Sequence, residues 1–182
     1  TLDYSEPDFV KLDMTDYVKK ILDKMPEEMA GTATSPAAAY LFRIVEGIEL
    51  LDEATSEFFH ATVAKLLFLC KRGRPDIQTA IAFLCTRVQQ PTKHDLNKLS
   101  RVIKYLRGTS TLALRLSAEN LNVVKWWVDA SYGVHHDMRS HPGAAFAPRT
   151  GAAYSTSKTH KLNTKSPTAT HLDHTVALYT TT

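Results

Sequence analysis

The sequence VVKWWVDASY, from Val123 to Tyr132, is the stretch that decides how this chain folds. Its valines and tryptophans form a nearly continuous apolar run, which predicts a β-strand buried on both faces. The run ends at Asp129, which two small residues follow. A carboxylate held at the end of a rigid strand is a common metal ligand or general base. An aspartate in this position can equally cap a turn, so both interpretations are open from this stretch alone.

The composition is that of a soluble globular chain. The 182 residues suffice for one sizeable core or two small ones, with 43% apolar and 23% charged side chains. The longest apolar stretch, residues 63–70, is too short to span a bilayer, so we expect no membrane partner. Cys70 and Cys85 fall on apolar helical faces and are expected to be buried thiols, which indicates an intracellular protein, cytoplasmic or nuclear. Because the sequence starts at Thr1, we expect a piece of a longer protein.

The charges are distributed unevenly along the chain. Residues 1–60 carry 5 basic and 13 acidic side chains, a net charge of −8. Residues 61–109 carry 10 basic and 2 acidic side chains, a net charge of +8, and residues 110–182 have a net charge of +3. A segment as basic as the middle one predicts a surface that faces a polyanion. The alternative is a solvated face that balances the acidic N-terminal part.

Apolar residues at helical spacing dominate the first two thirds of the chain. Residues 1–13 are expected to be irregular, Thr15 to Met25 to form a short helix, and 27–39 to form a loop. Three further helices are predicted over about 56–70, 76–88 and 95–107, with Gly108 as the cap of the last. Short breaks between these three helices predict a compact antiparallel bundle.

A basic stripe lies on the last of these helices, where four cationic residues follow one another at i+3 spacing. Such a stripe can run along phosphates, because each phosphate contact releases counterions. Three more cationic residues after residue 70 strengthen this interpretation over one of simple solubility. The predicted nucleic-acid-binding residues are therefore Lys71, Arg72, Arg74, Lys98, Arg101, Lys104 and Arg107.

After Gly108 the apolar period changes from helical spacing to two. Strands are predicted over 111–117, through the opening stretch, over 143–148 and over 152–157, with Thr150-Gly151 as a hairpin turn. Ser166-Pro167 predicts the start of a helix that runs to about residue 178. The fold class is therefore α+β: a small helical bundle followed by a short sheet with one helix.

The order of these elements resembles the C-terminal part of the reverse transcriptase region of Ty1/copia-type retrotransposon polyproteins, running into RNase H. The resemblance covers most of residues 56–172. The segments that carry it are AKLLFLCKRGRPDIQTAIAFL (64–84), KYLRGT (104–109), WWVDASYG (126–133), RSHPGA (139–144) and YSTSKTHKLNTKS (154–166).

The resemblance implies a division of the chain into three parts, and it implies its partners. It implies an acidic lead-in over 1–55, a thumb- and connection-like helical region over 56–118, and the N-terminal half of an RNase H-like domain over 119–182. It makes Asp129 the first of several RNase H carboxylates that bind Mg²⁺, catalytic by ancestry. The implied partners are an RNA–DNA hybrid or duplex and the rest of the polyprotein.

The sequence departs from the family pattern where the next catalytic acid is expected. Ala169 stands in place of the glutamate, and neither His171 nor Asp173 is a good substitute. No pair of adjacent aspartates marks a polymerase site. Although the family is RNA-directed DNA polymerase and RNase H, a two-metal reaction needs several carboxylates, so we expect this chain to be inactive by itself, with Asp129 vestigial.

Two other functions fit the residues. A nucleic-acid-binding module with a host role would retain the basic helices without catalysis. A small metalloprotein would instead use histidines, although their spacing matches no closed zinc pattern. Those candidate ligands are His135, His136, Asp137, His141, His171 and His174.

Overall fold

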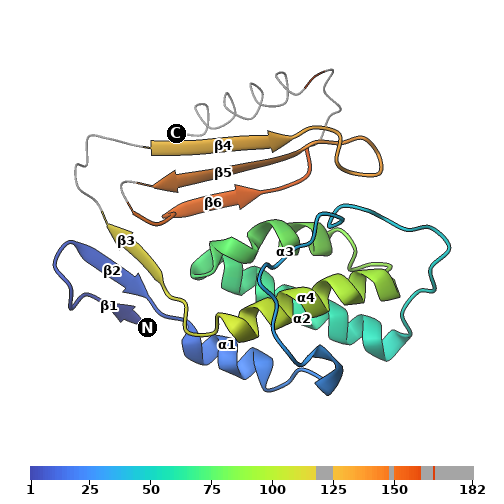
Figure 1. The fold of residues 1–182 in the computed structure, drawn as a ribbon, viewed down its shortest axis with the longest axis horizontal. Helices are drawn as coiled ribbons and strands as arrows, with labels where there is room; N and C mark the ends of the chain where they lie inside the picture. The colour runs from blue at the N-terminus through green and yellow to red at the C-terminus, as the bar shows by residue number, and fades with distance from the viewer. Residues whose placement is uncertain (118–124, 148–149, 161–165, 167–182) are drawn as a thin grey trace.

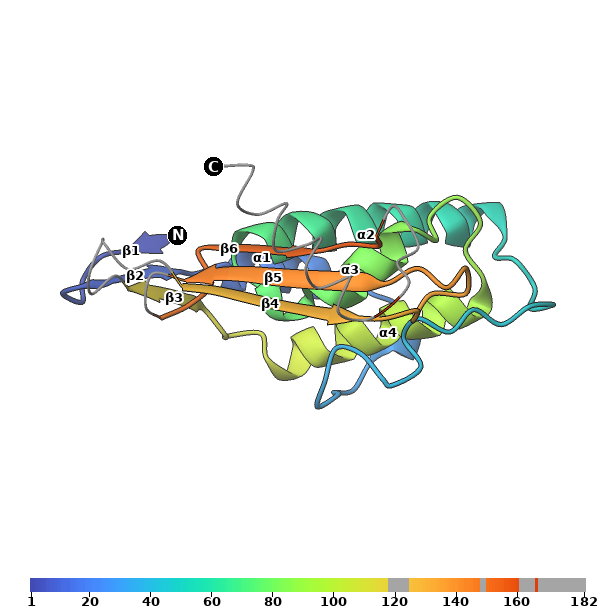
Figure 2. The ribbon, with the colours of Figure 1, turned by 90° about the horizontal axis from the view of Figure 1, so that it is seen from above.

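The structure, a computed structural model, describes residues 1–117, 125–147, 150–160 and 166. In this part of the chain the fold is α+β, which confirms the predicted class. It contains four α-helices and two three-stranded antiparallel sheets. The helices form one layer, and the second sheet lies over it (Figures 1 and 2). The helices are α1 (Thr15–Leu22), α2 (Glu53–Arg72), α3 (Gln78–Cys85) and α4 (Lys93–Gly108), with 3-10 turns η1 (Glu27–Met29) and η2 (Pro75–Ile77).

Caps in the sequence explain where the long helices begin. The side chain of Asp52 accepts a hydrogen bond from the backbone N–H of Thr55 and starts α2. At α4, Thr92 and Asp95 form a capping box, in which each side chain bonds the other's backbone N–H. Gly108, predicted as a cap, is the last residue of α4, and Thr109 takes the cap position.

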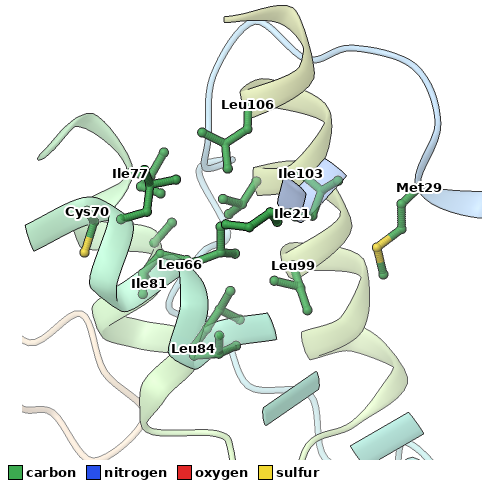
Figure 3. Packing of buried hydrophobic residues seen from close by; sticks show 14 of the residues in the cluster. Ile21, Met29, Leu66, Cys70, Ile77, Ile81, Leu84, Leu99, Ile103 and Leu106 are labelled. Atoms are coloured by element: carbon green, nitrogen blue, oxygen red, sulfur yellow. The ribbon is translucent and has the colours of Figure 1, made fainter. Parts of the chain in front are cut away.

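The core lies among the helices. Leu66 of α2, Ile81 of α3 and Leu99 of α4 have no exposed surface, and Figure 3 shows these side chains converging. Ile21 of α1 and Met29 of η1, from the N-terminal part of the chain, belong to the same buried cluster. The predicted three-helix bundle is thus confirmed, and α1 adds a fourth helix to it.

The first sheet corrects the prediction for the N-terminus. Residues 1–13 were expected to be irregular, but β1 (Leu2–Asp3) and β2 (Phe9–Leu12) are strands. β2 pairs antiparallel with β3 (Leu114–Ser117), so Phe9 lies opposite Ser117. The prediction failed because this partner strand lies about a hundred residues away in sequence, and local patterns carry no information about such pairing.

The second sheet has the order β4-β5-β6 and confirms the three strands predicted after residue 122. They are β4 (Lys125–Ser131), β5 (His141–Ala147) and β6 (Tyr154–Ser157), joined antiparallel. Trp127 pairs with Ala145, and Asp129 pairs with Gly143. Gly151, in the predicted turn, has a φ of +76°. A side chain in this conformation is strained.

The expectation that β4 is buried on both faces is wrong for its described residues. Along β4 every second residue is exposed, and Trp127 retains 64% of its surface. Trp126, on the other face, packs against Phe146 with the ring centroids 5.2 Å apart. The sequence does not show this alternation of buried and exposed residues, because both neighbouring tryptophans are apolar and only one of them is turned inward.

Polar contacts hold the second sheet against the helices. Gln78 of α3 donates a hydrogen bond to the carbonyl of Ser155 on β6 at 3.0 Å and accepts another from the Ser155 hydroxyl. Lys71 donates to the same carbonyl at 3.3 Å. Nearby, the hydroxyl of Ser157 donates to that of Thr79 at 3.2 Å. This sheet therefore meets α3 largely through hydrogen bonds.

Some predictions fall outside the described residues. Apart from Ser166, the helix expected from there to about residue 178 lies outside them, as do Ala169, His171, Asp173 and His174. The division at residues 55 and 118 stays a prediction, although the pairing of β2 with β3 connects the first part to the second. Among the described helices, no segment is both long and apolar enough to cross a membrane.

Candidate nucleic-acid interface

The C-terminal ends of α2 and α4 lie side by side. Arg74, just after α2, donates a hydrogen bond from Nη1 to the carbonyl of Thr109, just after α4, at 2.9 Å. Its Nη2 donates to the Thr109 hydroxyl at 2.7 Å. Cationic residues are favourable in the last turn of a helix because they face the negative end of its dipole. One end of the helical layer therefore gathers basic residues from two helices.

Arg74, predicted to bind nucleic acid, lies in the interior. Only 1% of its surface is exposed, and its guanidinium forms a bidentate ion pair with Asp76 at 2.7 to 3.2 Å. Tyr105 donates a hydrogen bond to the same carboxylate at 2.9 Å. With these partners the buried guanidinium joins the two helix ends and does not face a nucleic acid.

Lys98 of the predicted basic stripe is also buried. Its ammonium donates to the carbonyl of Arg43 at 2.7 Å and lies 4.4 Å from the centre of the Phe83 ring. Asp95 lies 3.8 Å from it. Burial lowers the pKa of Lys98, and the nearby Asp95 carboxylate opposes this change. This residue therefore ties the loop before α2 to α4.

The loop between η1 and α2 covers much of the stripe. Besides the bond from Lys98, the N–H of Ala33 donates to the carbonyl of Lys104 at 3.3 Å. Arg101 donates from Nη2 to the hydroxyl of Ser35 at 3.0 Å. Phosphates cannot follow the whole stripe while this loop is in place. No local pattern predicts that this loop covers the stripe, because the loop is polar and rich in small residues.

Lys71 and Arg72, at the end of α2, are exposed. The guanidinium carbon of Arg72 lies 5.6 Å from the ring centre of Phe68, which is itself 49% exposed. Phe68 also contacts the ring of Tyr17 on α1, with centroids 5.4 Å apart. Phe68 and Tyr17 were not predicted as part of the surface. Their pairing with a cation could have been anticipated from the i, i+4 spacing of Phe68 and Arg72.

Lys104 and Arg107, on the last turns of α4, are half-buried. Neither forms an ion pair with any other residue of the described part. The Nε atoms of Arg107 and Arg101 are buried and have no hydrogen-bond partner among the described residues. Of the seven predicted binding residues, those that present charge at the surface are therefore Lys71, Arg72, Arg101, Lys104 and Arg107.

Asp129 lies within β4, two residues before its end, and is exposed. Its Oδ1 accepts a hydrogen bond from the N–H of Ala130 at 2.9 Å. It lines a groove of about 440 Å³ between the second sheet and α3, together with Trp127, Gln78 and other residues. Within the part of the chain that the structure describes, no other carboxylate lines this groove. The donor set of the described residues therefore does not fit a pair of Mg²⁺ ions, which needs several carboxylates.

Other metal or thiol chemistry finds no support in the described residues. No three histidine, cysteine or acidic side chains among them are grouped so that they could bind an ion. The proposed zinc ligands His135 and His141 are adjacent, but a structural zinc site takes four ligands. Burial raises the pKa of the Cys70 thiol to about 11, so it is not a nucleophile at neutral pH.

Comparisons with known proteins relate the chain to a transposon. It is 29% identical over 94 residues to the putative transposon Ty5-1 protein YCL074W of Saccharomyces cerevisiae, covering 52% of this chain and 30% of that protein. It is 29% identical over 105 residues to the uncharacterized mitochondrial protein AtMg00810 of Arabidopsis thaliana, covering 58% of this chain and 42% of that protein. The chain thus spans less than half the length of each relative.

No family profile matches the chain, and no solved structure matches it. The similarity to a transposon protein confirms the expected resemblance at a coarse level. The chain is distantly related to proteins of transposable elements.

Proposed function

We propose that the chain is a segment of a copia-type retrotransposon polyprotein that binds nucleic acid without catalysing a reaction by itself. The observation that carries this proposal is the group of basic residues, exposed on α2 and half-buried on α4, where α2 and α4 end together. Lys71, Arg72, Lys104 and Arg107 belong to this group, and Arg74 holds the two helix ends in place. The distant similarity to a transposon protein supports the same function.

The binding surface is proposed to contact the phosphates of an RNA–DNA hybrid or duplex. Lys and Arg bind phosphates through charge, and Arg adds directional hydrogen bonds. The exposed ring of Phe68 beside Arg72 offers an apolar contact at the edge of the surface. Arg74 and Lys98 are not part of this proposed surface because they are buried in contacts within the chain.

The lack of catalysis is proposed from Asp129 and from the sequence at Ala169. Asp129 is the single carboxylate among the described residues that line its groove, and alanine cannot ligate a metal. The remainder of the polyprotein is the proposed partner that would contribute further carboxylates.

A binding titration against salt tests the proposed surface. We expect the affinity for an RNA–DNA hybrid to fall steeply with salt, with a slope that decreases by about 1 to 2 when two phosphate contacts are removed. The variant is the double substitution Lys104→Gln, Arg107→Gln, which should weaken binding about tenfold at moderate salt.

The matched control is the double substitution Lys19→Gln, Lys20→Gln, which removes the same charge from an exposed face of α1. It should leave the slope unchanged. An equal loss in both variants would show that net charge alone attracts the nucleic acid and would contradict the proposed surface. Both variants are compared by far-UV circular dichroism to show that they are folded.

Incubation of the chain with hybrid and Mg²⁺ tests the lack of catalysis. We expect intact hybrid after prolonged incubation. Cleavage by the unmodified chain that Asp129→Asn abolishes would overturn this part of the proposal and leave the binding surface standing.

A further inference from the structure

Two histidines lie at the end of a continuous chain of hydrogen bonds that runs from the second sheet to α3. His135 follows β4, and His141 begins β5. His135 Nε2 lies 2.9 Å from His141 Nδ1, and His141 Nε2 lies 2.7 Å from the hydroxyl of Ser157 on β6. That hydroxyl donates to Thr79 of α3 at 3.2 Å. The chain therefore crosses from the sheet to the helical layer.

The direction of these bonds determines the protonation of both rings. Ser157 has one hydroxyl hydrogen, which it donates to Thr79, so its oxygen accepts from His141 Nε2–H. A neutral imidazole carries one N–H, so His141 Nδ1 is an acceptor. His135 Nε2 must then donate to it, and Thr159, 3.1 Å from the same atom, shares that hydrogen. The network is complete only when His141 is neutral, whereas a proton added at His135 Nδ1 would leave these bonds in place.

Aromatic rings surround the pair on the side of the helical layer. The ring of Phe42, from the loop before α2, lies 4.9 Å from His135 and 4.7 Å from His141 between centroids. Phe83 of α3 stacks on His135 at 6.3 Å. Burial lowers the pKa of His141 to about 4, with a smaller contribution from His135, and burial also lowers the pKa of His135.

The charged groups near the two histidines do little to raise the pKa values that burial lowers. Asp137 raises the pKa of His135, but Arg139 lowers it, and these two residues form an ion pair at 3.1 Å. Of the other carboxylates, Asp95 pairs with Arg87 at 3.2 Å, and Glu46 lies 3.3 Å from His136, an ion pair only when His136 is protonated. An imidazolium at either position would lack a dedicated counterion among these groups.

We propose that His135 and His141 form an acid-released clamp that docks the β4-β5-β6 sheet on α3. At neutral pH both rings are neutral and the hydrogen-bond chain is intact. A proton on His141 Nδ1 places an N–H against the N–H of His135, which breaks the bond and puts a charge between the aromatic rings. That bond lies within the sheet, and the Ser157–Thr79 bond to α3 is retained. The charge buried against Phe83 of α3 and Phe42 is what makes the sheet separate from α3, while the helical core stays folded.

The sign of the pH dependence follows from the lowered pKa values. An undocked histidine has an ordinary pKa near 6.5, so it binds a proton that the docked form excludes. The docked state therefore has its full stability above about pH 6.5 and loses it as the pH falls toward 4. His141 alone weakens docking about tenfold at pH 5.5, and His135 adds to the loss.

Tryptophan fluorescence and imidazole nitrogen shifts test the clamp. Both tryptophans of the chain, Trp126 and Trp127, lie on β4, and Trp127 lines the groove against α3. Between pH 7.5 and 4.5 we expect their emission to change while the circular dichroism at 222 nm stays constant. The ¹⁵N spectrum at pH 7.5 should show both rings as neutral Nε2–H tautomers.

The test variant is the double substitution His135→Gln, His141→Gln, which cannot titrate, and the control is His136→Gln. The double variant should lose the change in emission, whereas the control should keep it. An unaltered transition in the double variant would overturn the proposal. If the double variant does not fold, the titration of the unmodified chain decides: an His141 pKa near 6.5 would also overturn it.

Discussion

The helical layer and the second sheet differ in how they are held together. Leu66, Ile81 and Leu99 are completely buried at the meeting point of three helices. In the sheet, by contrast, the buried apolar side chains among the described residues are small ones, those of Pro142, Ala144 and Ala147. The helices thus have a core of their own, whereas the sheet depends on hydrogen bonds from Ser155 and Ser157 to α3. Apolar burial stabilises without directional requirements, while a hydrogen-bonded junction responds to small chemical changes.

The basic residues also divide into buried ones that hold the fold together and exposed ones at the surface. Arg74 has the charge and sequence context of Arg72 but almost none of its exposure. One arginine organises the helix ends and the other presents charge at the surface. The residue type therefore predicts a positive charge at both positions, and burial decides whether that charge binds within the chain or faces solvent.

Removal of core volume should give the largest difference between the two regions. Leu66→Ala leaves a cavity in a site that is closely packed on all sides, so we expect it to lower the free energy of unfolding by about 4 kcal/mol. Phe146→Ala, in the half-buried face of the sheet, should lower it by about 1 to 2 kcal/mol. Urea denaturation followed at 222 nm measures both values. Equal losses would contradict the claim that the core lies in the helices.

Removal of the buried guanidinium is expected to have the next largest effect. Arg74→Ala leaves Asp76 and the carbonyl of Thr109 without their partner and should lower the free energy of unfolding by about 3 kcal/mol. Arg72→Ala, two residues earlier and exposed, should change it by less than about 1 kcal/mol. The hybrid-binding assay should show the reverse order, with Arg72→Ala weakening binding more than a folded Arg74→Lys variant does.

A methyl group at Gly151 tests the junction between the two sheets. Its φ is +76°, and a Cβ there would lie 2.0 Å from the carbonyl oxygen of Arg115 in β3. Gly151→Ala should therefore destabilise the protein by about 2 kcal/mol or more. Gly47→Ala has a similar φ of +74° but meets nothing within 4 Å, so only the backbone strain of about 1 kcal/mol is expected. A thermal melt that ranks the two equally would show that β3 can move away.

Loss of the cap on α4 should have the smallest of these effects. Thr92→Ala removes the hydroxyl that bonds the backbone N–H of Asp95 and should lower the free energy of unfolding by about 1 kcal/mol. Thr92→Ser retains the hydroxyl and serves as the control. The urea midpoint of Thr92→Ala should be lower than that of Thr92→Ser. Identical midpoints would mean that the capping box does not stabilise the helix measurably.

The sequence by itself determined the helices, the three later strands and the excess of basic residues after residue 60. Each of these depends on patterns within about twenty residues: apolar spacing, caps such as Thr92, and changes of period. These patterns act locally, and so they can be recognised without a partner segment.

Only the tertiary structure decided which of the basic residues remain at the surface. Lys98 and Arg74 look the same in sequence as their exposed neighbours, but a distant loop covers the first and a distant helix end binds the second. The pairing of β2 with β3 and the meeting of His135 with His141 beside Phe42 were decided in the same way. Burial and long-range pairing depend on segments that are far apart along the chain, and a local pattern contains no information about which of them will meet.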